Sequence, residues 1–126
     1  YENNRAFGKY FAELLLPIIF REAWSIDAVI PIPLSKERLR ERGYNQAAAV
    51  AYPLAVFLDV PYQPFGLEQV RDTRSQVGLS AEERRLNVID AFKANMDLVS
   101  DKNILLVDDV MTTGATIESC AKAFFR

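Results

Sequence analysis

The segment from Ile104 to Thr116 constrains the fold of this chain more than any other. It begins with four consecutive apolar residues that end at Val107, a run that predicts a strand buried on both faces. Asp108 and Asp109 follow at once, so we expect their carboxylates to lie where the strand leaves the core. Open α/β sheets bind ligands at that carboxyl end of the strands. The segment therefore predicts a parallel α/β fold with a ligand site after this strand.

Small and hydroxyl-bearing residues come next, immediately before an expected helix over residues 117–125. A turn of this composition leaves backbone N–H groups unpaired and adds hydroxyl donors at a helix N-terminus, which suits a phosphate. Carboxylates beside such a turn indicate a ligand with both hydroxyls and phosphate, such as a ribose phosphate. The alternative is a buried strand that ends in a solvated Asp-Asp turn with an ordinary Thr cap. The candidate phosphate-binding residues are Met111, Thr112, Thr113, Gly114, Ala115 and Thr116.

The composition excludes several kinds of chemistry. The chain has no histidine, which excludes Ser-His-Asp and Cys-His catalysis and any His-ligated metal. Cys120 is the only cysteine, so we expect a small core residue rather than a disulfide or a Cys-rich zinc site. Fifteen basic and seventeen acidic residues give a net charge of −2, so no global field attracts nucleic acid or a membrane. The apolar run at 14–20 is too short to span a bilayer, so we expect no membrane insertion and a cytoplasmic location.

A length of 126 residues predicts one domain, and its strands and helices are expected to alternate as parallel βαβ units. Apolar residues at helical spacing predict a first helix over 4–24, which Pro17 should kink or split. The other expected elements are a strand at 28–30, a helix over 45–58 with Asn45 as N-cap, a short strand within 66–71, and a short helix over 80–87 opened by a capping box.

A basic block follows the predicted strand at 28–30. Lys36, Arg38, Arg40 and Arg42 lie within seven positions, close to where a ligand crevice would open. Two glutamates interrupt the block, so its spacing alone favours a solvated surface. A pyrophosphate-bearing ligand would require such cations, because an Arg guanidinium pairs with phosphate oxygens bidentately.

A third polar block contains Arg71, Arg74 and Gln76. Residues 72–78 lack apolar periodicity, which predicts a mobile loop that could close over a phosphorylated substrate and exclude water. An ordinary exposed loop has the same composition, so the two interpretations stay open.

Together, these blocks resemble the ComF family, whose members are phosphoribosyltransferase-like proteins linked to competence and DNA uptake. The resemblance rests on Pro-x-Pro-Leu at 31–34, Arg-x-Arg-Gly-Tyr-Asn-Gln at 40–46, the polar block at 71–80, Glu-Arg-x-x-Asn at 83–87 and the Asp-Asp loop. It covers nearly the whole chain, and Thr73, Arg84 and Asn87 also match motif positions of the family. The segment at 104–116 is similar to the phosphoribosyl pyrophosphate signature of type I phosphoribosyltransferases.

The resemblance implies an α/β, single-domain, parallel-sheet type I phosphoribosyltransferase fold over 1–126, with helices on both faces. It implies that Asp108 and Asp109 hold the ribose as catalytic residues and that residues 111–116 grip the 5-phosphate. Mg²⁺ is the implied cofactor, bound through the substrate and by Asp108 or Asp109, with no other direct metal site. The residues expected to receive pyrophosphate are Lys36, Arg38, Arg42, Arg71, Arg74 and Gln76.

The implied reaction transfers phosphoribose from phosphoribosyl pyrophosphate to a base or amine that the sequence does not identify. The rival hypothesis is a non-catalytic module that uses the same loop to bind a nucleotide or single-stranded DNA, with the competence machinery as partner. The family's N-terminal Cys-rich zinc module and the strand after the last helix are missing between Tyr1 and Arg126, so we expect trimmed ends. The oligomeric state stays open.

Overall fold

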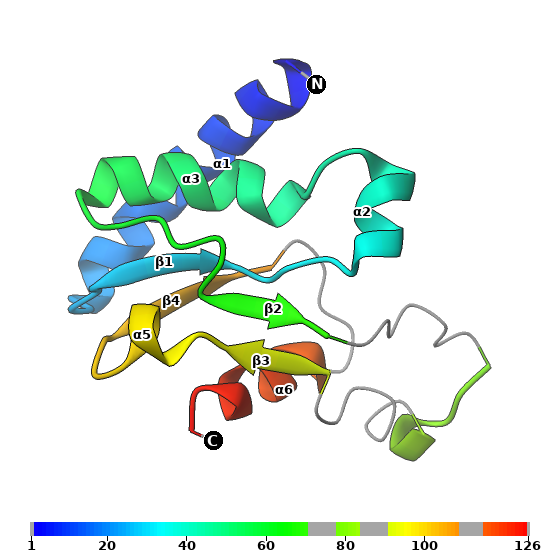
Figure 1. Cartoon of the computed structure of the whole chain (residues 1–126). Coiled ribbons are helices and arrows are strands. Elements are labelled where there is room, and N and C mark those ends of the chain that lie inside the picture. Colours follow the sequence, from blue (N-terminus) through cyan, green and yellow to red (C-terminus); the bar gives the residue numbers. More distant parts are fainter. Residues whose placement is uncertain (1, 71–77, 84–90, 109–114, 126) are drawn as a thin grey trace.

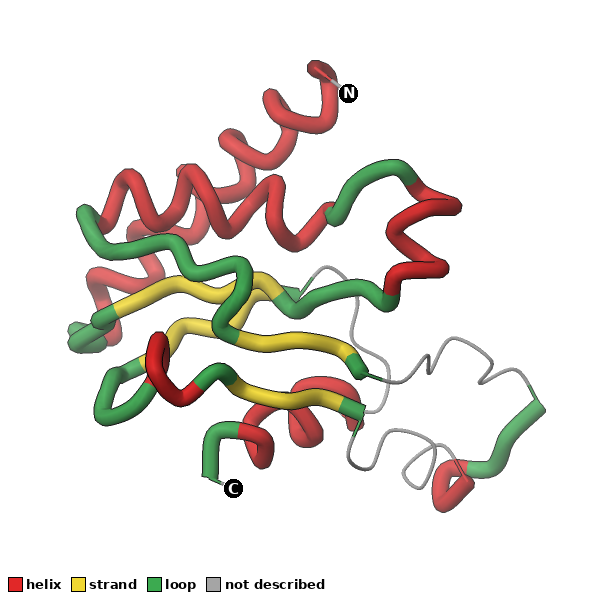
Figure 2. Tube along the Cα trace, in the orientation of Figure 1, coloured by secondary structure: helices red, strands yellow, loops and turns green. Residues whose placement is uncertain are grey.

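The computed structural model of the chain describes residues 2–70, 78–83, 91–108 and 115–125 (Figure 1). Figure 2 shows both helices and strands along this trace, which confirms the α/β class, although α2 and α3 follow one another without a strand between them. The elements in chain order are α1 (Glu2–Glu22), β1 (Ala28–Pro31), α2 (Lys36–Arg42), α3 (Gln46–Leu58), β2 (Leu67–Gln69), β3 (Phe92–Ala94), α5 (Met96–Val99), β4 (Ile104–Val107) and α6 (Ala115–Ala123).

Strands β1 and β4 form a parallel pair at the centre of the fold. Ala28 is opposite Ile104 and Pro31 is opposite Val107, so the two strands end side by side. On the other edge of β1, Val29 forms an isolated parallel bridge with Tyr62. The predicted parallel arrangement is therefore present, and both predicted strands are confirmed.

The two faces of this pair are buried by different elements. Val29 and Val107 belong to a core cluster with Ala12 of α1 and Leu54 of α3. Ile30, one residue along β1, belongs to a second cluster with Phe92 of β3 and Cys120 of α6. Because side chains alternate along a strand, adjacent residues of β1 supply both clusters. Helices α1 and α3 thus lie on one face and α6 on the other, as expected from the resemblance.

Helix α1 packs on α3 through small residues. A Cβ built on Gly8 would collide with the carbonyl oxygen of Ala49, so only glycine permits this close approach of the two helices. The sequence analysis expected Pro17 to kink or split this helix, and a split is wrong because α1 runs through that residue as one helix. Pro17 is exposed, so the carbonyl group that its ring leaves unpaired lies on the solvent side. None of the described helices combines the length and the apolar character needed to cross a membrane.

Strands β2 and β3 depart from the expected parallel architecture. They pair antiparallel, with Leu67 opposite Ala94 and Gln69 opposite Phe92, in a sheet separate from β1 and β4. Leu67 and Phe92 are buried and extend the second core cluster. The predicted short strand within 66–71 is confirmed, whereas its antiparallel partner was too short to recognise from the sequence.

The capping box predicted at the start of the helix over 80–87 is present. The Ser80 hydroxyl accepts a hydrogen bond from the Glu83 N–H at 3.2 Å, and the Glu83 carboxylate accepts one from the Ser80 N–H at 3.3 Å. This reciprocal pair is a capping box, and helical structure begins at residue 81. The remainder of that predicted helix lies outside the described residues.

Candidate functional site

The carboxyl ends of β1 and β4 form one continuous edge. The Ile32 N–H donates to the Val107 carbonyl oxygen at 2.8 Å, so the chain leaving β1 stays bound to the end of β4. Asp108 is the next residue and is half-buried. The structure therefore places this predicted site residue at the carboxyl end of a parallel strand, where the sequence indicated it.

Helix α2 contains the basic block. The sequence analysis did not predict a helix in this segment. Its N-cap is Ser35, whose hydroxyl accepts from the Arg38 N–H at 3.2 Å, and it ends at Gly43 with a φ of 81°. A Ser N-cap eight residues before a helix-ending Gly was the signal that could have revealed it. Figure 1 shows α2 beyond the carboxyl end of β1.

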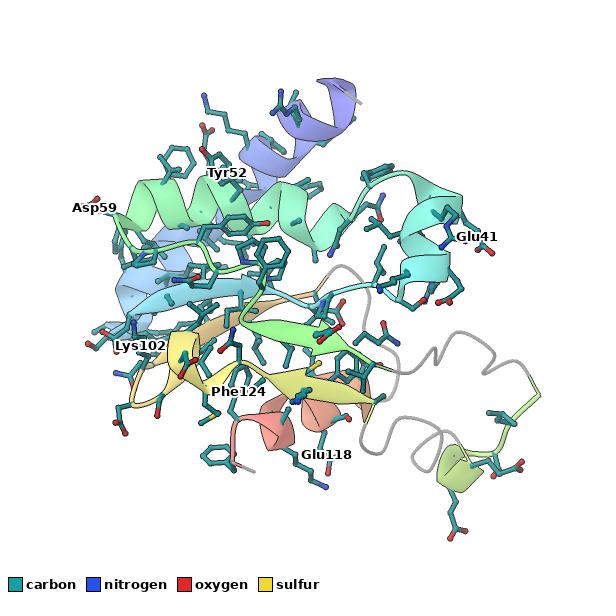
Figure 3. The ribbon with its side chains drawn as sticks, in the orientation of Figure 1. Glu41, Tyr52, Asp59, Lys102, Glu118 and Phe124 are labelled. Carbon is teal, nitrogen blue, oxygen red and sulfur yellow. The ribbon has the colours of Figure 1, made fainter. Side chains whose placement is uncertain are left out.

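The cations of α2 lie at this same end of the sheet. None of its residues is buried, so Lys36, Arg38 and Arg42 remain accessible to solvent to different degrees. Glu41 projects from the outer side of α2, away from the sheet (Figure 3). The basic block and Asp108 thus share one edge of the fold.

Asn45 ties the N-terminus of α3 to the same edge. Its side-chain carbonyl accepts from the N–H groups of Ala47 at 2.9 Å and Ala48 at 3.4 Å, which confirms the predicted N-cap. Its amide group donates to the Ile32 carbonyl oxygen at 3.1 Å. One side chain therefore fixes the start of α3 against the chain leaving β1.

A groove lies between α1, α3 and the end of β4, with a volume of about 530 Å³. We call it the apolar groove, because Phe7, Phe11, Leu14 and Ile18 of α1 form much of its wall. Asp108 lies at one end of it. A carboxylate beside an apolar hollow can orient a polar group of a ligand whose ring or chain occupies the hollow.

A second groove of about 550 Å³ lies along the α1–α3 contact and reaches the Tyr62 segment. We call it the tyrosine groove. Its wall contains Arg5, Lys9, Tyr44, Tyr52 and Tyr62. Sequence reasoning singled out Tyr44 but missed the others, because they come from elements far apart in the chain and share no local pattern.

Cys120 reports on the electrostatics around Asp108. Burial and, as the smaller cause, the negative charge of Asp108 together raise the pKa of the Cys120 thiol to about 12. The thiol is fully buried in α6, which confirms the expected small core residue. Asp108 is therefore close enough to α6 for its charge to be felt there.

The structure covers only part of the predicted phosphate loop. Ala115 and Thr116 are the first residues of α6, so the predicted loop leads directly into a helix N-terminus. The helix expected over 117–125 is confirmed, but it begins at Ala115 and ends at Ala123. Site residues that lie outside the described part of the chain are Asp109, Met111, Thr112, Thr113, Gly114, Arg71, Arg74 and Gln76. The expected loop over 72–78 also lies outside it, except for residue 78.

Comparison with known proteins gives relatives of one kind. Over 98 residues the chain is 39% identical to competence protein F of Haemophilus influenzae, covering 76% of this chain and 43% of that protein. Over 99 residues it is 37% identical to competence protein ComFC of Bacillus subtilis, covering 78% and 38%. Over 100 residues it is 32% identical to DNA utilization protein YhgH of Escherichia coli K12, covering 79% and 44%.

The chain thus spans less than half the length of these curated relatives. No family model and no solved structure matches it. The site and fold define a mixed α/β protein with a polar edge at the ends of two parallel strands. The relatives support its place in the ComF family.

Proposed function

We propose that this chain is the phosphoribosyl pyrophosphate-binding part of a phosphoribosyltransferase-like protein with the type I fold. The observation that carries the proposal is the position of Asp108, directly after β4, with α6 beginning at Ala115. A strand, an acidic turn and a helix N-terminus in this order suit a ribose phosphate. The parallel pair with helices on both faces supports the fold assignment.

In this proposal each part of the edge binds one part of the substrate. Asp108 and Asp109 accept hydrogen bonds from the ribose hydroxyls, and residues 111–116, the last two of which begin α6, bind the 5-phosphate. The cations of α2, with Arg71, Arg74 and Gln76, receive the pyrophosphate. These groups contribute by orientation and by charge stabilisation, since the substrate itself carries the leaving group.

The reaction is a displacement at the ribose anomeric carbon. The bond to the pyrophosphate oxygen breaks and its electron pair leaves with pyrophosphate. A nitrogen of the acceptor forms the new bond and then loses its proton. The carboxylate of Asp108 stabilises positive charge that develops on the ribose ring.

Mg²⁺ fits the residues present. Mg²⁺ is commonly held by one or two carboxylates together with substrate phosphates, and Asp108 offers a half-buried carboxylate at this edge. Within the described part of the chain, no three His, Cys, Asp or Glu side chains gather into a metal site of their own. When bound, the ion would neutralise charge on the departing pyrophosphate.

The names of the relatives favour a role in competence and DNA use, which we extend to this chain as part of the proposal. A cytoplasmic setting is part of the same proposal. The second candidate function is a non-catalytic module that binds a nucleotide or single-stranded DNA at this edge, because one relative is named for DNA utilization rather than for a transferase.

Calorimetry with phosphoribosyl pyrophosphate, with and without Mg²⁺, tests the binding step. Asp108→Asn keeps the shape of the side chain and removes its charge, so affinity should fall by about 1–3 kcal/mol. Asp101→Asn is the matched control, since Asp101 is an exposed carboxylate before β4 with a φ of 60°, which Asn tolerates. Equal affinity of the Asp108 variant and the parent would contradict the ribose assignment.

A screen of bases and amines for pyrophosphate release then separates the two candidate functions. Release that depends on one acceptor, and that Asp108→Asn reduces, identifies a transferase. Tight substrate binding without release by any acceptor would favour the non-catalytic module.

A further inference from the structure

The α1 wall of the apolar groove is a continuous hydrocarbon surface. Phe7, Phe11, Leu14 and Ile18 recur at steps of four, three and four residues, which places them in one stripe along the helix. Each of these side chains is about half exposed, between 47% and 62%. The described part of the chain therefore leaves this stripe partly open to water. An apolar ligand that covered it would be stabilised by the area that it removes from water.

The floor of the groove is made of backbone and small side chains. It lies where α1 approaches α3, at Gly8 and Ala49. A Cβ on Gly8 would collide with the Ala49 carbonyl, so the groove is as deep as a backbone contact allows. The Phe11 ring packs edge to face on Tyr10, with centroids 5.9 Å apart, which restricts its rotation. The groove volume of about 530 Å³ lies within the range of small-molecule sites.

Among the described residues that line the groove, Asp108 has the only charge. The other polar side chains are those of Tyr44 and Gln46, and the Gln46 amide donates to the Tyr44 hydroxyl at 3.1 Å. These two groups therefore satisfy part of their hydrogen bonding with each other. A carboxylate accepts hydrogen bonds and repels anions. The groove thus favours a ligand with an apolar body and one donor group at the end that meets Asp108.

We propose that the apolar groove binds an uncharged aromatic amine. Its ring lies against Phe7 and Phe11, and its N–H donates to the Asp108 carboxylate. A purine or pyrimidine fits less well, because the polar atoms on its edges would lie against hydrocarbon without partners. An aliphatic amine also fits less well, because it is protonated at pH 7 and would bring a full charge into an apolar groove.

The use of this amine as the acceptor rests on the proposed function. Asp108 belongs both to the groove and to the edge proposed to hold the ribose, so the bound amine has its nitrogen beside that edge. The nitrogen lone pair forms the new bond to the anomeric carbon as the bond to the pyrophosphate oxygen breaks, and pyrophosphate keeps that electron pair. The nitrogen then gives one proton to the Asp108 carboxylate.

The test uses naphthylamine, a fluorescent aromatic amine whose emission depends on the polarity of its surroundings. We expect it to bind the whole chain with a shift of its emission to shorter wavelength. Naphthoate has a carboxylate in place of the amine, and in competition it should bind at least about 5-fold more weakly, the repulsion of two like charges about 4 Å apart in water. Asp108→Asn should remove this preference, because it keeps the shape of the side chain and removes its charge.

Phe11→Ala tests the apolar wall. It should weaken binding of both probes roughly 2- to 13-fold, the range for losing one aromatic pair. Phe20→Ala is the matched control, since Phe20 is a 65% exposed phenylalanine of α1 outside the described lining of the groove. Phe11→Leu removes the ring, keeps apolar bulk, and serves if Phe11→Ala fails to fold.

Three results would overturn the proposal: naphthylamine does not bind, naphthoate binds the parent equally well, or Phe11→Ala and Phe20→Ala have the same effect. These titrations contain no phosphoribosyl pyrophosphate. Amine binding without binding of that substrate would therefore contradict the transferase proposal alone, and the reverse result would contradict the amine site alone. Pyrophosphate release with a purine or pyrimidine, and with no aromatic amine, would refute the use of the groove for the acceptor.

Discussion

The apolar groove and the tyrosine groove use the same two helices and have opposite chemistry. Both include Tyr44 and Ala49, where α3 begins. The apolar groove continues along α1 through Phe11 and Leu14 and ends at Asp108, whereas the tyrosine groove has Lys9 in its wall. One helix pair therefore supplies an apolar surface and a cationic aromatic surface, depending on which face of α1 is considered.

Residues only two positions apart in α1 belong to the two different kinds of surface. Lys9 and Phe11 are two residues apart in α1, about 200° around the helix, and so they face different grooves. The common requirement is the contact at Gly8, which sets how closely α1 approaches α3. A change at that contact should affect both grooves, whereas a change on one face of α1 should affect one.

Gly8→Val should have the largest effect and should damage both grooves. A branched side chain would collide with the Ala49 carbonyl, which belongs to the backbone and cannot turn away. We expect a loss of about 3 kcal/mol in the free energy of unfolding, at the upper end for overpacking. Ala6→Val, at an exposed position of the same helix, should cost less than about 1 kcal/mol. Urea unfolding measures the stability loss of each variant. Similar losses for Gly8→Val and Ala6→Val would contradict the close contact between Gly8 and Ala49.

Asn45→Ala should be next in size, because this residue fixes the point that both grooves share. The change removes the N-cap of α3 and the hydrogen bond to the Ile32 carbonyl. We expect a loss of about 1–2 kcal/mol, measured by urea unfolding. Gln46→Ala removes a neighbouring exposed amide without a capping role and should leave stability nearly unchanged. Equal effects of the two variants would show that the cap contributes little.

Leu14→Gln changes the apolar groove and leaves the lining of the tyrosine groove unchanged. Leu14 is 51% exposed in the apolar groove, so the polar substitution should cost about 1 kcal/mol or less. Leu16→Gln is the matched change on the buried side of α1 and should cost more, since Leu16 packs against the first core cluster. Urea unfolding measures both losses, and equal losses for the two variants would contradict the difference in burial between Leu14 and Leu16.

Cys120 gives the most local test. Its raised pKa of about 12 means that the folded protein keeps the thiol proton above pH 9.0, where an unfolded chain loses it. Stability should therefore fall as pH rises from about 9 toward about 12.

Alkylation of the single cysteine measures the same property. Iodoacetamide should react slowly with the folded protein at pH 9 and quickly in urea, because little thiolate is present and the thiol is buried. Asp108→Asn should raise the alkaline rate slightly, since burial is the larger cause. Rapid alkylation of the native parent would contradict both the burial and the charge assignment.

Much of the fold could be predicted from the sequence, because the signals are local. The apolar run before Asp108 identified β4, Asn45 identified the start of α3, and Ser80 with Glu83 identified a capping box. These patterns depend on residues within a few positions of one another. The position of Asp108 at the strand's carboxyl end followed from the same logic.

The remaining features depend on contacts between distant residues. The antiparallel pairing of β2 and β3 joins short strands whose composition gives no pairing direction. The tyrosine groove combines Lys9, Tyr44 and Tyr62 from three separate segments. Pro17 does not split α1, because packing of α1 on α3 stabilises the helix on both sides of that residue. Tertiary contacts of this kind leave no mark on local sequence.

The register of β1 against β4 has a consequence for how the chain folds. At the start of the strands, the Asp27 N–H donates to the Asn103 carbonyl at 2.8 Å, and the Asp27 carboxylate accepts from the Asn103 N–H at 2.8 Å, across 76 residues of sequence. The central sheet therefore has a high contact order, and closing so long a loop precedes any gain from pairing. During synthesis, β1 cannot pair with β4 until β4 has left the ribosome. Until then, the apolar edge of β1 is exposed to other nascent chains and to chaperones.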